Sequence, residues 1–368
     1  MISRRMFYLI TVVLIQAAFA TNTVNAETSR ETNGKTKANS PSALRFSAAG
    51  DYIWCGPNHL ALSHGKFLGI KLLNINNKEI KEISTPRPHQ RAVACTPDVK
   101  YLFYIDNGVS GEVNVLDVET GDHSLVYSGN NWLHSKIDET PLSEDGSKVI
   151  VPHSSIEHLK LRERHMTTVQ VPDSLNNDFI DDVAWSENGT LFILFRDKRH
   201  TKGLYILPND GNDKIANLPD IPGYFIKQIE WDKSGQALYF LAWPDTDVDE
   251  AKIFSFEIGK EKSSLKEHVS GFFDSFELLS DGVIAFVQTV GVKGDQDYSY
   301  VSNTARSEVK IHDISIGEEV VLYAIGFSPE FIGNLKVSPD RRHLAFLNWK
   351  EGNKASKEIV LVPVEAHN

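Results

Sequence analysis

The stretch Val337-Ser-Pro-Asp-Arg-Arg-His-Leu-Ala345 decides the fold of this 368-residue chain, because the same pattern recurs along the sequence. An apolar residue is followed by a tight polar turn and then by alternating apolar positions. The other copies are Phe46-Ser-Ala-Ala-Gly-Asp-Tyr-Ile-Trp54, Cys95-Thr-Pro-Asp-Val-Lys-Tyr-Leu-Phe103, Leu142-Ser-Glu-Asp-Gly-Ser-Lys-Val-Ile150, Trp185-Ser-Glu-Asn-Gly-Thr-Leu-Phe-Ile193, Trp231-Asp-Lys-Ser-Gly-Gln-Ala-Leu-Tyr239 and Leu279-Ser-Asp-Gly-Val-Ile-Ala285. A repeat at a fixed spacing indicates an array of equivalent structural units.

The turns recur at intervals of 43 to 59 residues, close to the ~40–50 residues of a four-stranded propeller blade. The runs around them alternate with period 2, as in Tyr101-Leu-Phe-Tyr-Ile105, and are rich in β-branched and aromatic residues. We therefore predict an all-β fold: a seven-bladed β-propeller, or alternatively a six- or eight-bladed one, of four-stranded antiparallel blades over residues 43–366. Each repeated turn is expected between the first two strands of its blade.

Several copies carry a more specific motif. Ser338-Pro339-Asp340, Thr96-Pro97-Asp98 with Lys100, Ser143-Glu-Asp-Gly146 and Asp117-Val-Glu-Thr-Gly121 resemble the WD40-like repeats of the TolB propeller domain and of related propellers in the prolyl-oligopeptidase group. The resemblance implies blade geometry. It does not imply the Pal-binding role of TolB, because no α/β domain precedes the blades and the repeat count suggests seven blades where TolB has six.

Closure of the ring leaves two alternatives. Only three residues follow the last predicted strand, 357–365, so the final blade lacks a fourth strand of its own. Either this blade has three strands, or a segment around residues 42–47 completes it.

The first segment has the form of a secretory leader. Arg4 and Arg5 precede a short apolar run over residues 7–19, and Val24-Asn25-Ala26 offers a cleavage site. We expect residues 1–26 to be removed, residues 27–42 to form a flexible polar tether, and the mature protein to be periplasmic or secreted. Loss of two arginines would take the formal net charge from −11 to −13, which argues against nucleic acid as a partner. No other stretch is long and apolar enough to span a membrane.

Export makes a disulfide between Cys55 and Cys95 a candidate. We expect Cys55 in the second strand of repeat one and Cys95 at the end of the first strand of repeat two. The alternative is that both are buried small apolar residues.

Candidate ligand- or partner-binding residues come from three segments. The connections into the second and third blades carry polar and aromatic groups, although an aromatic residue there can simply cap the core. The long interval before the last repeat contains an insertion, residues 291–307, whose tyrosines among small polar residues suit a recognition loop. The candidates are Arg87, His89, Arg91, Asn131, Trp132, His134, Tyr298 and Tyr300.

Signatures of catalysis and metal binding are weak. His59, His64, His89, His134, His153 and His158 form no ligand pair at a recognisable spacing. Alternate carboxylates in Asp245-Thr-Asp-Val-Asp-Glu250 could wrap a calcium ion, but the glycine and distal Glu of an EF-hand loop are missing, which favours a solvated hairpin loop. There is no nucleophile elbow and no glycine-rich phosphate loop. We therefore assign no catalytic residue, no metal and no cofactor.

The sequence thus favours an exported soluble propeller that acts as a protein- or ligand-binding or scaffolding module, with a protein or a small polar ligand bound at the propeller mouth. The alternatives are a propeller enzyme, a metal- or His/Asp-dependent lyase or hydrolase acting on a sugar or peptide, and a subunit of a larger periplasmic complex with no ligand of its own.

Overall fold

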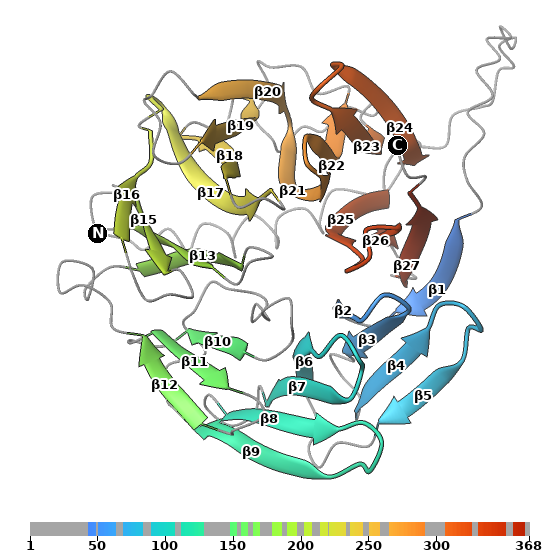
Figure 1. Ribbon diagram of the computed structural model, residues 1–368. Helices are drawn as coiled ribbons and strands as arrows, with labels where there is room; N and C mark the ends of the chain where they lie inside the picture. The colour runs from blue at the N-terminus through green and yellow to red at the C-terminus, as the bar shows by residue number, and fades with distance from the viewer. Residues whose placement is uncertain are drawn as a thin grey trace, which may run out of the picture. The chain divides into compact units, whose positions relative to one another are not determined.

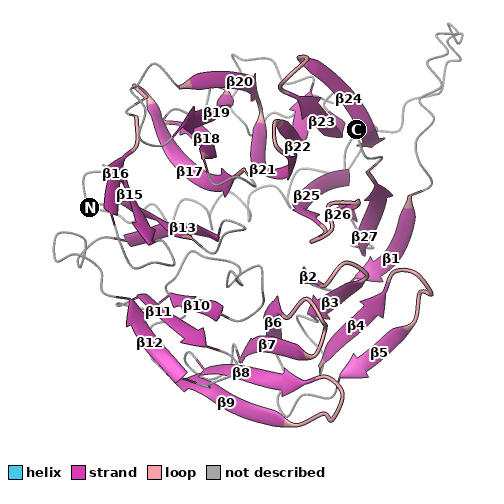
Figure 2. Ribbon diagram, viewed as in Figure 1, coloured by secondary structure: helices cyan, strands magenta, loops and turns pink. Residues whose placement is uncertain are grey.

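Strands are the only regular elements in the residues that the computed structural model describes (Figure 2). These residues are 43–48, 51–63, 69–83, 90–106, 112–128, 148–152, 156–160, 165–169, 179–185, 190–196, 202–207, 214–219, 221–232, 236–245, 250–257, 265–290, 306–325, 330–350 and 356–364. They contain no helix that could cross a membrane. Their strands form six four-stranded sheets and one three-stranded sheet, in which all pairings are antiparallel. The predicted all-β class with four-stranded antiparallel blades is therefore confirmed, while the number of blades stays a prediction.

Three sheets come first in the chain (Figure 1). They are β2 (Tyr52–Cys55), β3 (His59–Ser63), β4 (Ile70–Asn74) and β5 (Ile80–Ile83); then β6 (Gln90–Cys95), β7 (Tyr101–Asp106), β8 (Glu112–Asp117) and β9 (His123–Ser128); and then β10 (Lys148–Pro152), β11 (Ile156–Lys160) and β12 (His165–Val169).

Three further sheets follow. They are β13 (Phe179–Trp185), β14 (Leu191–Arg196), β15 (Lys202–Leu207) and β16 (Lys214–Asn217); then β17 (Tyr224–Trp231), β18 (Ala237–Pro244), β19 (Ala251–Glu257) and β20 (Lys266–Gly271); and then β21 (Phe273–Ser280), β22 (Val283–Val290), β23 (Arg306–Asp313) and β24 (Glu318–Ile325).

The last sheet combines both ends of the chain. It consists of β25 (Glu330–Val337), β26 (His343–Lys350), β27 (Ser356–Pro363) and the N-terminal strand β1 (Leu44–Ala48). β1 pairs antiparallel with β27, from Leu44 opposite Leu361 to Ala48 opposite Lys357, and Figure 1 shows the two strands side by side. Of the two ways to complete the final blade, the structure shows the one in which the N-terminal segment supplies the fourth strand.

This pairing corrects the expectation for the first repeat. Phe46 lies in β1, so the turn that follows it connects two different sheets instead of two strands of one blade. The first hairpin of this blade turns between Cys55 and His59, which face each other across β2 and β3. Cys55 therefore ends the first strand of its sheet, as Cys95 does in the next, and its prediction in a second strand was wrong. The two cysteines form a disulfide.

The repeated turn holds its shape through one hydroxyl group. In the copy after β6, Thr96 Oγ1 donates to Asp98 Oδ1 at 2.6 Å and accepts a hydrogen bond from the Tyr101 amide at 2.9 Å. In the copy after β25, Ser338 Oγ makes the same bonds with Asp340 at 2.6 Å and with the His343 amide at 2.9 Å. A Ser or Thr and an Asp two residues later thus satisfy the turn's polar groups locally, which explains why the motif recurs.

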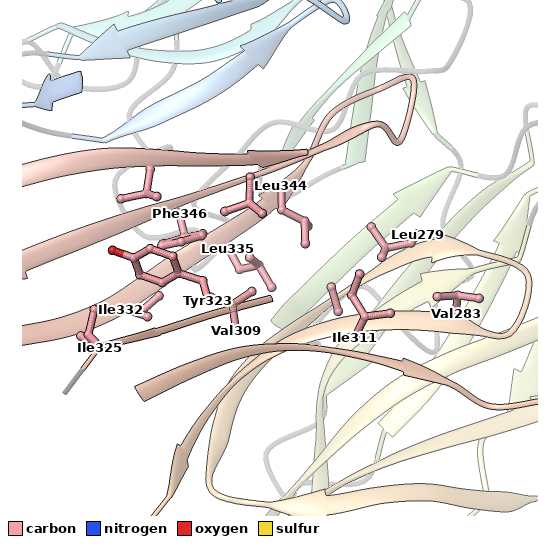
Figure 3. Close-up of a cluster of buried hydrophobic side chains, with 13 residues drawn as sticks. Leu279, Val283, Val309, Ile311, Tyr323, Ile325, Ile332, Leu335, Leu344 and Phe346 are labelled. Atoms are coloured by element: carbon pink, nitrogen blue, oxygen red, sulfur yellow. The ribbon is translucent and has the colours of Figure 1, made fainter. Parts of the chain in front are cut away.

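Hydrophobic clusters fill the spaces between neighbouring sheets. In Figure 3, Val309 and Ile311 of one sheet lie with Leu344 and Phe346 of the next in a single buried cluster. Equivalent clusters lie between four other pairs of sheets. Two of them join β13–β16 to β17–β20 and β17–β20 to β21–β24. The other two join the sheet formed by β1 and β25–β27 to β2–β5, and β2–β5 to β6–β9. Each fully buried side chain of this size contributes roughly 1.5–3 kcal/mol, so packing of sheet on sheet is the main source of stability.

Candidate binding surface at the entry end

The first strands of neighbouring sheets run in the same direction, so the sheets have two ends in common. Tyr52 Oη donates to the carbonyl of Asn334, and Trp54 Nε1 donates to the carbonyl of Lys336 at 3.3 Å, so β2 and β25 run in the same direction. We call the end at which the first strands β2, β6, β17, β21 and β25 begin the entry end. The opposite end, where the first hairpin of each sheet turns, is the turn end.

The longer connections attach to the entry end. The second and fourth strands of an antiparallel sheet end where its first strand begins. The 19 residues after β9 and the 15 residues after β22 therefore leave their sheets at the entry end. At the turn end, by contrast, two residues connect β21 to β22 and five connect β25 to β26.

Seven of the eight predicted binding residues belong to segments attached to the entry end but lie outside the described residues: Arg87, His89, Asn131, Trp132, His134, Tyr298 and Tyr300. The eighth, Arg91, lies near the start of β6 and is partly buried. Its Nε is 4.0 Å from Oδ2 of Asp51, the residue before β2. The guanidinium therefore faces a carboxylate of the neighbouring sheet at this end.

A lysine–tryptophan pair occupies the entry end of the sheet β17–β20. Phe225 near the start of β17 lies opposite Trp243 near the end of β18. A bulge between Ile226 and Gln228 adds Lys227 to the strand, and the Lys227 Nζ lies 4.0 Å from the centroid of the Trp243 ring. Lys227 is exposed and Trp243 is partly buried. Bulges re-aim side chains, and this one places a cation on an aromatic face.

The bulge also links this sheet to the next. Gln228 Nε2 donates to the carbonyl of Phe276 at 2.7 Å, and Gln228 Oε1 accepts from the amide of the same residue at 3.2 Å. Gln228 therefore bonds with both main-chain groups of one residue in β21. This connection fixes the backbone from which Lys227 projects.

A second lysine–aromatic pair lies nearby. Lys252 near the start of β19 has its Nζ 5.6 Å from the centroid of the Tyr224 ring and 2.9 Å from Glu267 Oε2. The hydrogen bond with the Glu267 carboxylate raises the pKa of Lys252, so the amine stays charged. Tyr224 packs against the cluster shared with the sheet β13–β16, and Trp243 packs against the cluster shared with β21–β24, so the two pairs lie on opposite faces at the same end of this sheet. We call these four residues, Tyr224, Lys227, Trp243 and Lys252, the lysine–aromatic surface. Each pair places a cation beside an aromatic ring, an arrangement that stabilises the position of both side chains.

The sequence alone did not indicate these residues. The nearest signal in the sequence was Trp243-Pro244 before the acidic stretch 245–250, which was interpreted as a calcium loop or a solvated hairpin loop. Asp245 and Glu250 are exposed, and residues 246–249 lie outside the described residues. Lys227 gave no signal, because its role depends on a bulge that the alternation of β17 does not reveal.

Within the described ranges, no group of three or more His, Cys, Asp or Glu residues could hold a metal ion. His59 Nε2 instead lies 3.1 Å from Asn74 Nδ2, and burial lowers its pKa. His158 lies in β11, and the other four histidines considered as ligands fall outside the described residues.

The arrangement of sheets is that of known β-propellers. The chain is similar to the tricorn protease (12% identity, TM-score 0.59), and the similarity covers 90% of this chain and 35% of that one. It is also similar to the β-propeller domain of Myceliophteria thermophila Cps50 (Swd1) (11% identity, TM-score 0.57), over 88% of this chain and 99% of that one. A third similar structure is an oligogalacturonate lyase from Vibrio parahaemolyticus (9% identity, TM-score 0.56), over 85% and 90% of the two chains.

At these identities the similarity shows the fold alone: the protein is a β-propeller of WD40-like architecture. No family model matches the sequence, and no curated protein matches it. The similar structures include both the Cps50 (Swd1) β-propeller domain and enzymes, so the fold does not distinguish a binding protein from a catalyst.

Proposed function

We propose that this protein is an exported, seven-bladed, TolB-like propeller that acts as a binding or scaffolding module and uses its entry end to hold a partner protein. The observation that carries the proposal is the contrast between the two ends. The entry end presents the lysine–aromatic surface and anchors the two longest connections. The first hairpins at the turn end close through short turns.

Tryptophan and tyrosine are enriched at the centres of protein interfaces, and charges such as those of lysine steer a complementary partner toward them. Lys227 and Trp243 are held in place by a bulge and by the bonds of Gln228 with β21, so binding would cost little ordering of these side chains. The predicted recognition residues Trp132, Tyr298 and Tyr300 belong to connections that start at the same end. Rigid strands and long connections together would therefore present one continuous interaction surface.

Export rests on the leader sequence and is supported by chemistry. Arg4, Arg5 and the apolar run after them have the order of a secretory signal. A disulfide between Cys55 and Cys95 persists in an oxidising compartment such as the periplasm or the exterior. Both features support the same location.

Affinity capture from the native compartment, with quantification of the proteins retained, tests the proposal. The test variant is Lys227→Ala with Trp243→Ala. The chain offers a matched control at the turn end, where Lys100 Nζ lies 5.3 Å from the centroid of the Tyr101 ring. We expect one partner to be retained by wild type and by Lys100→Ala with Tyr101→Ala, and to be lost with the test variant.

Loss of the partner in both variants, or in neither, would exclude the entry end as the binding surface. The competing enzyme hypothesis predicts a different result: stoichiometric bound metal in protein purified without a His tag, or turnover of an oligosaccharide or peptide. An oligogalacturonate lyase with manganese is among the similar structures, which makes oligogalacturonate the first substrate to assay.

A further inference from the structure

The outer edge of the sheet β21–β24 differs from the other outer edges. β24 is the outermost strand of its sheet, and no described strand pairs with its free side. It has eight residues, whereas β1, β5, β9, β12, β16 and β20 have between four and six. A long open edge presents a row of unpaired amide and carbonyl groups, which is a template for another strand.

Apolar side chains accompany this edge. Among the described residues, five large hydrophobic side chains are exposed, and three belong to this one hairpin: Ile316 (65%), Val320 (44%) and Val321 (41%). The other two, Ile80 and Leu125, lie singly on β5 and β9. An exposed apolar group next to open backbone is typical of a surface that another chain covers.

One common protection of an edge, a basic residue or a proline, is missing here. Outer strands are commonly guarded by Lys or Pro. Four of the other six, β1, β5, β16 and β20, contain a Lys or an Arg, and the two that do not, β9 and β12, are shorter than β24. β24 reads Glu-Glu-Val-Val-Leu-Tyr-Ala-Ile and has neither Lys, Arg nor Pro. Its only charges are Glu318 and Glu319.

The free part of the edge is its first half. Residues from Glu318 to Val321 pair with β23 in regular register, and a bulge follows before Tyr323. Beyond the bulge, Tyr323 Oη accepts a hydrogen bond from Arg45 Nη2 of β1 at 2.9 Å, which joins that half to the next sheet. An added strand would therefore run along residues 318–321.

The negative charge of this edge indicates which kind of segment it can bind. Glu318 and Glu319 are both exposed, and one Glu319 oxygen lies 2.6 Å from Lys310 Nζ. The whole chain carries a formal net charge of −11, so two copies would repel each other. We propose that β24 binds an extended segment of a partner protein by strand addition, and that this segment combines apolar residues with Lys or Arg at the end that lies beside Glu318. In antiparallel addition, this is the carboxyl end of the segment.

A synthetic probe tests this surface independently of the entry end. The probe is a fluorescent ten-residue peptide of alternating valine and threonine that ends in two lysines. The control peptide has the same pattern but ends in two glutamates. Fluorescence anisotropy should show that the lysine peptide binds at least about tenfold more tightly than the glutamate peptide. Amide hydrogen exchange should show new protection in β24.

The test variant is Val320→Lys with Val321→Lys, which adds the missing edge protection. The matched control is Leu125→Lys, the same change at an exposed apolar position on another outer strand. We expect the test variant to lose at least about tenfold in affinity and the control to bind as wild type does, both with unchanged thermal midpoints. Absence of peptide binding, equal binding by the test variant, or dimerisation through β24 without peptide would each overturn the proposal. Because Lys227 and Trp243 are untouched, failure here leaves the proposed function standing.

Discussion

Cys55 and Cys95 are the last residues of β2 and β6, the first strands of two adjacent sheets, and their disulfide brings the two Cα atoms to 5.0 Å. The bond lies in the cluster of buried residues that fills the space between these sheets. It therefore reinforces covalently an interface that packing already forms. Other interfaces between sheets are joined by hydrogen bonds, such as that from Trp54 to the carbonyl of Lys336.

Removal of this disulfide should lower stability without changing the fold. Cys55 and Cys95 are 40 residues apart, and opening a loop of this length costs about 2–4 kcal/mol in free energy of unfolding. We expect Cys55→Ser with Cys95→Ser to show this loss in urea titrations. Reduced wild type should unfold like the variant. Alkylation of both cysteines in unreduced wild-type protein, detected by mass spectrometry, would contradict the pairing.

Gly56, the residue after Cys55, should tolerate no side chain. Its φ is +65°, and a Cβ there would lie 2.4 Å from the carbonyl oxygen of Pro97 in the adjacent turn. Gly56→Ala adds this clash to the cost of a left-handed backbone, so we expect a loss above about 2 kcal/mol. Gly121→Ala is the control, because Gly121 has φ +77° with nothing within 4 Å of the added Cβ. It should lose only about 1 kcal/mol, and equal losses would contradict the argument from close approach.

Closure by β1 predicts a sharp boundary in a truncation series. Removal of residues 27–42 should leave the free energy of unfolding within about 0.5 kcal/mol of wild type, because the strand begins at Leu44. Removal of residues 27–48 should cost at least about 3 kcal/mol, since it exposes the ladder of β27 and uncovers the cluster against which Leu44 and Phe46 pack.

Phe46→Ala provides a milder variant of the same test if the longer truncation does not fold. It should lower the thermal midpoint, because it removes only the apolar contact and keeps the strand pairing. A stable protein without residues 27–48 would show that the last sheet needs only three strands.

Acid should weaken the interface between the sheets β17–β20 and β21–β24 through His268. Burial, and then the charges of His312 and Lys266, lower the pKa of His268 from 6.5 to about 4, and its Nε2 lies 2.7 Å from Ser255 Oγ. Between pH 6.5 and pH 4 the unfolded chain takes up a proton that the folded protein does not bind. Stability is therefore greatest above pH 6.5 and falls as the pH drops toward 4.

We expect a loss of about 1–2 kcal/mol from this histidine, because it is partly exposed and solvent screens the effect. Urea titrations at pH 7, 5.5 and 4 measure it, with His268→Gln as the comparison. The variant should show a shallower pH dependence. Parallel curves for wild type and variant would exclude His268 as the source.

The fold was predictable from the sequence where a local pattern determines structure. The turn residues Thr96 and Ser338 form their hydrogen bonds within five residues, so their recurrence indicated β-hairpins at a regular spacing. The first repeat was misplaced because Phe46 pairs with Ile359, about 300 positions away, and no local pattern shows such a partner. Lys227 and Trp243 were missed for a related reason, since their contact requires a bulge and a register between two strands.

Site-specific photo-crosslinking in the native compartment tests most directly whether the entry end is the interaction surface. A photoreactive amino acid replaces Lys227 at the entry end in one variant and Lys100 at the turn end in another. The proposed function predicts a discrete crosslinked partner from position 227 and none from position 100. A partner crosslinked from position 100, or none from either position, would contradict it.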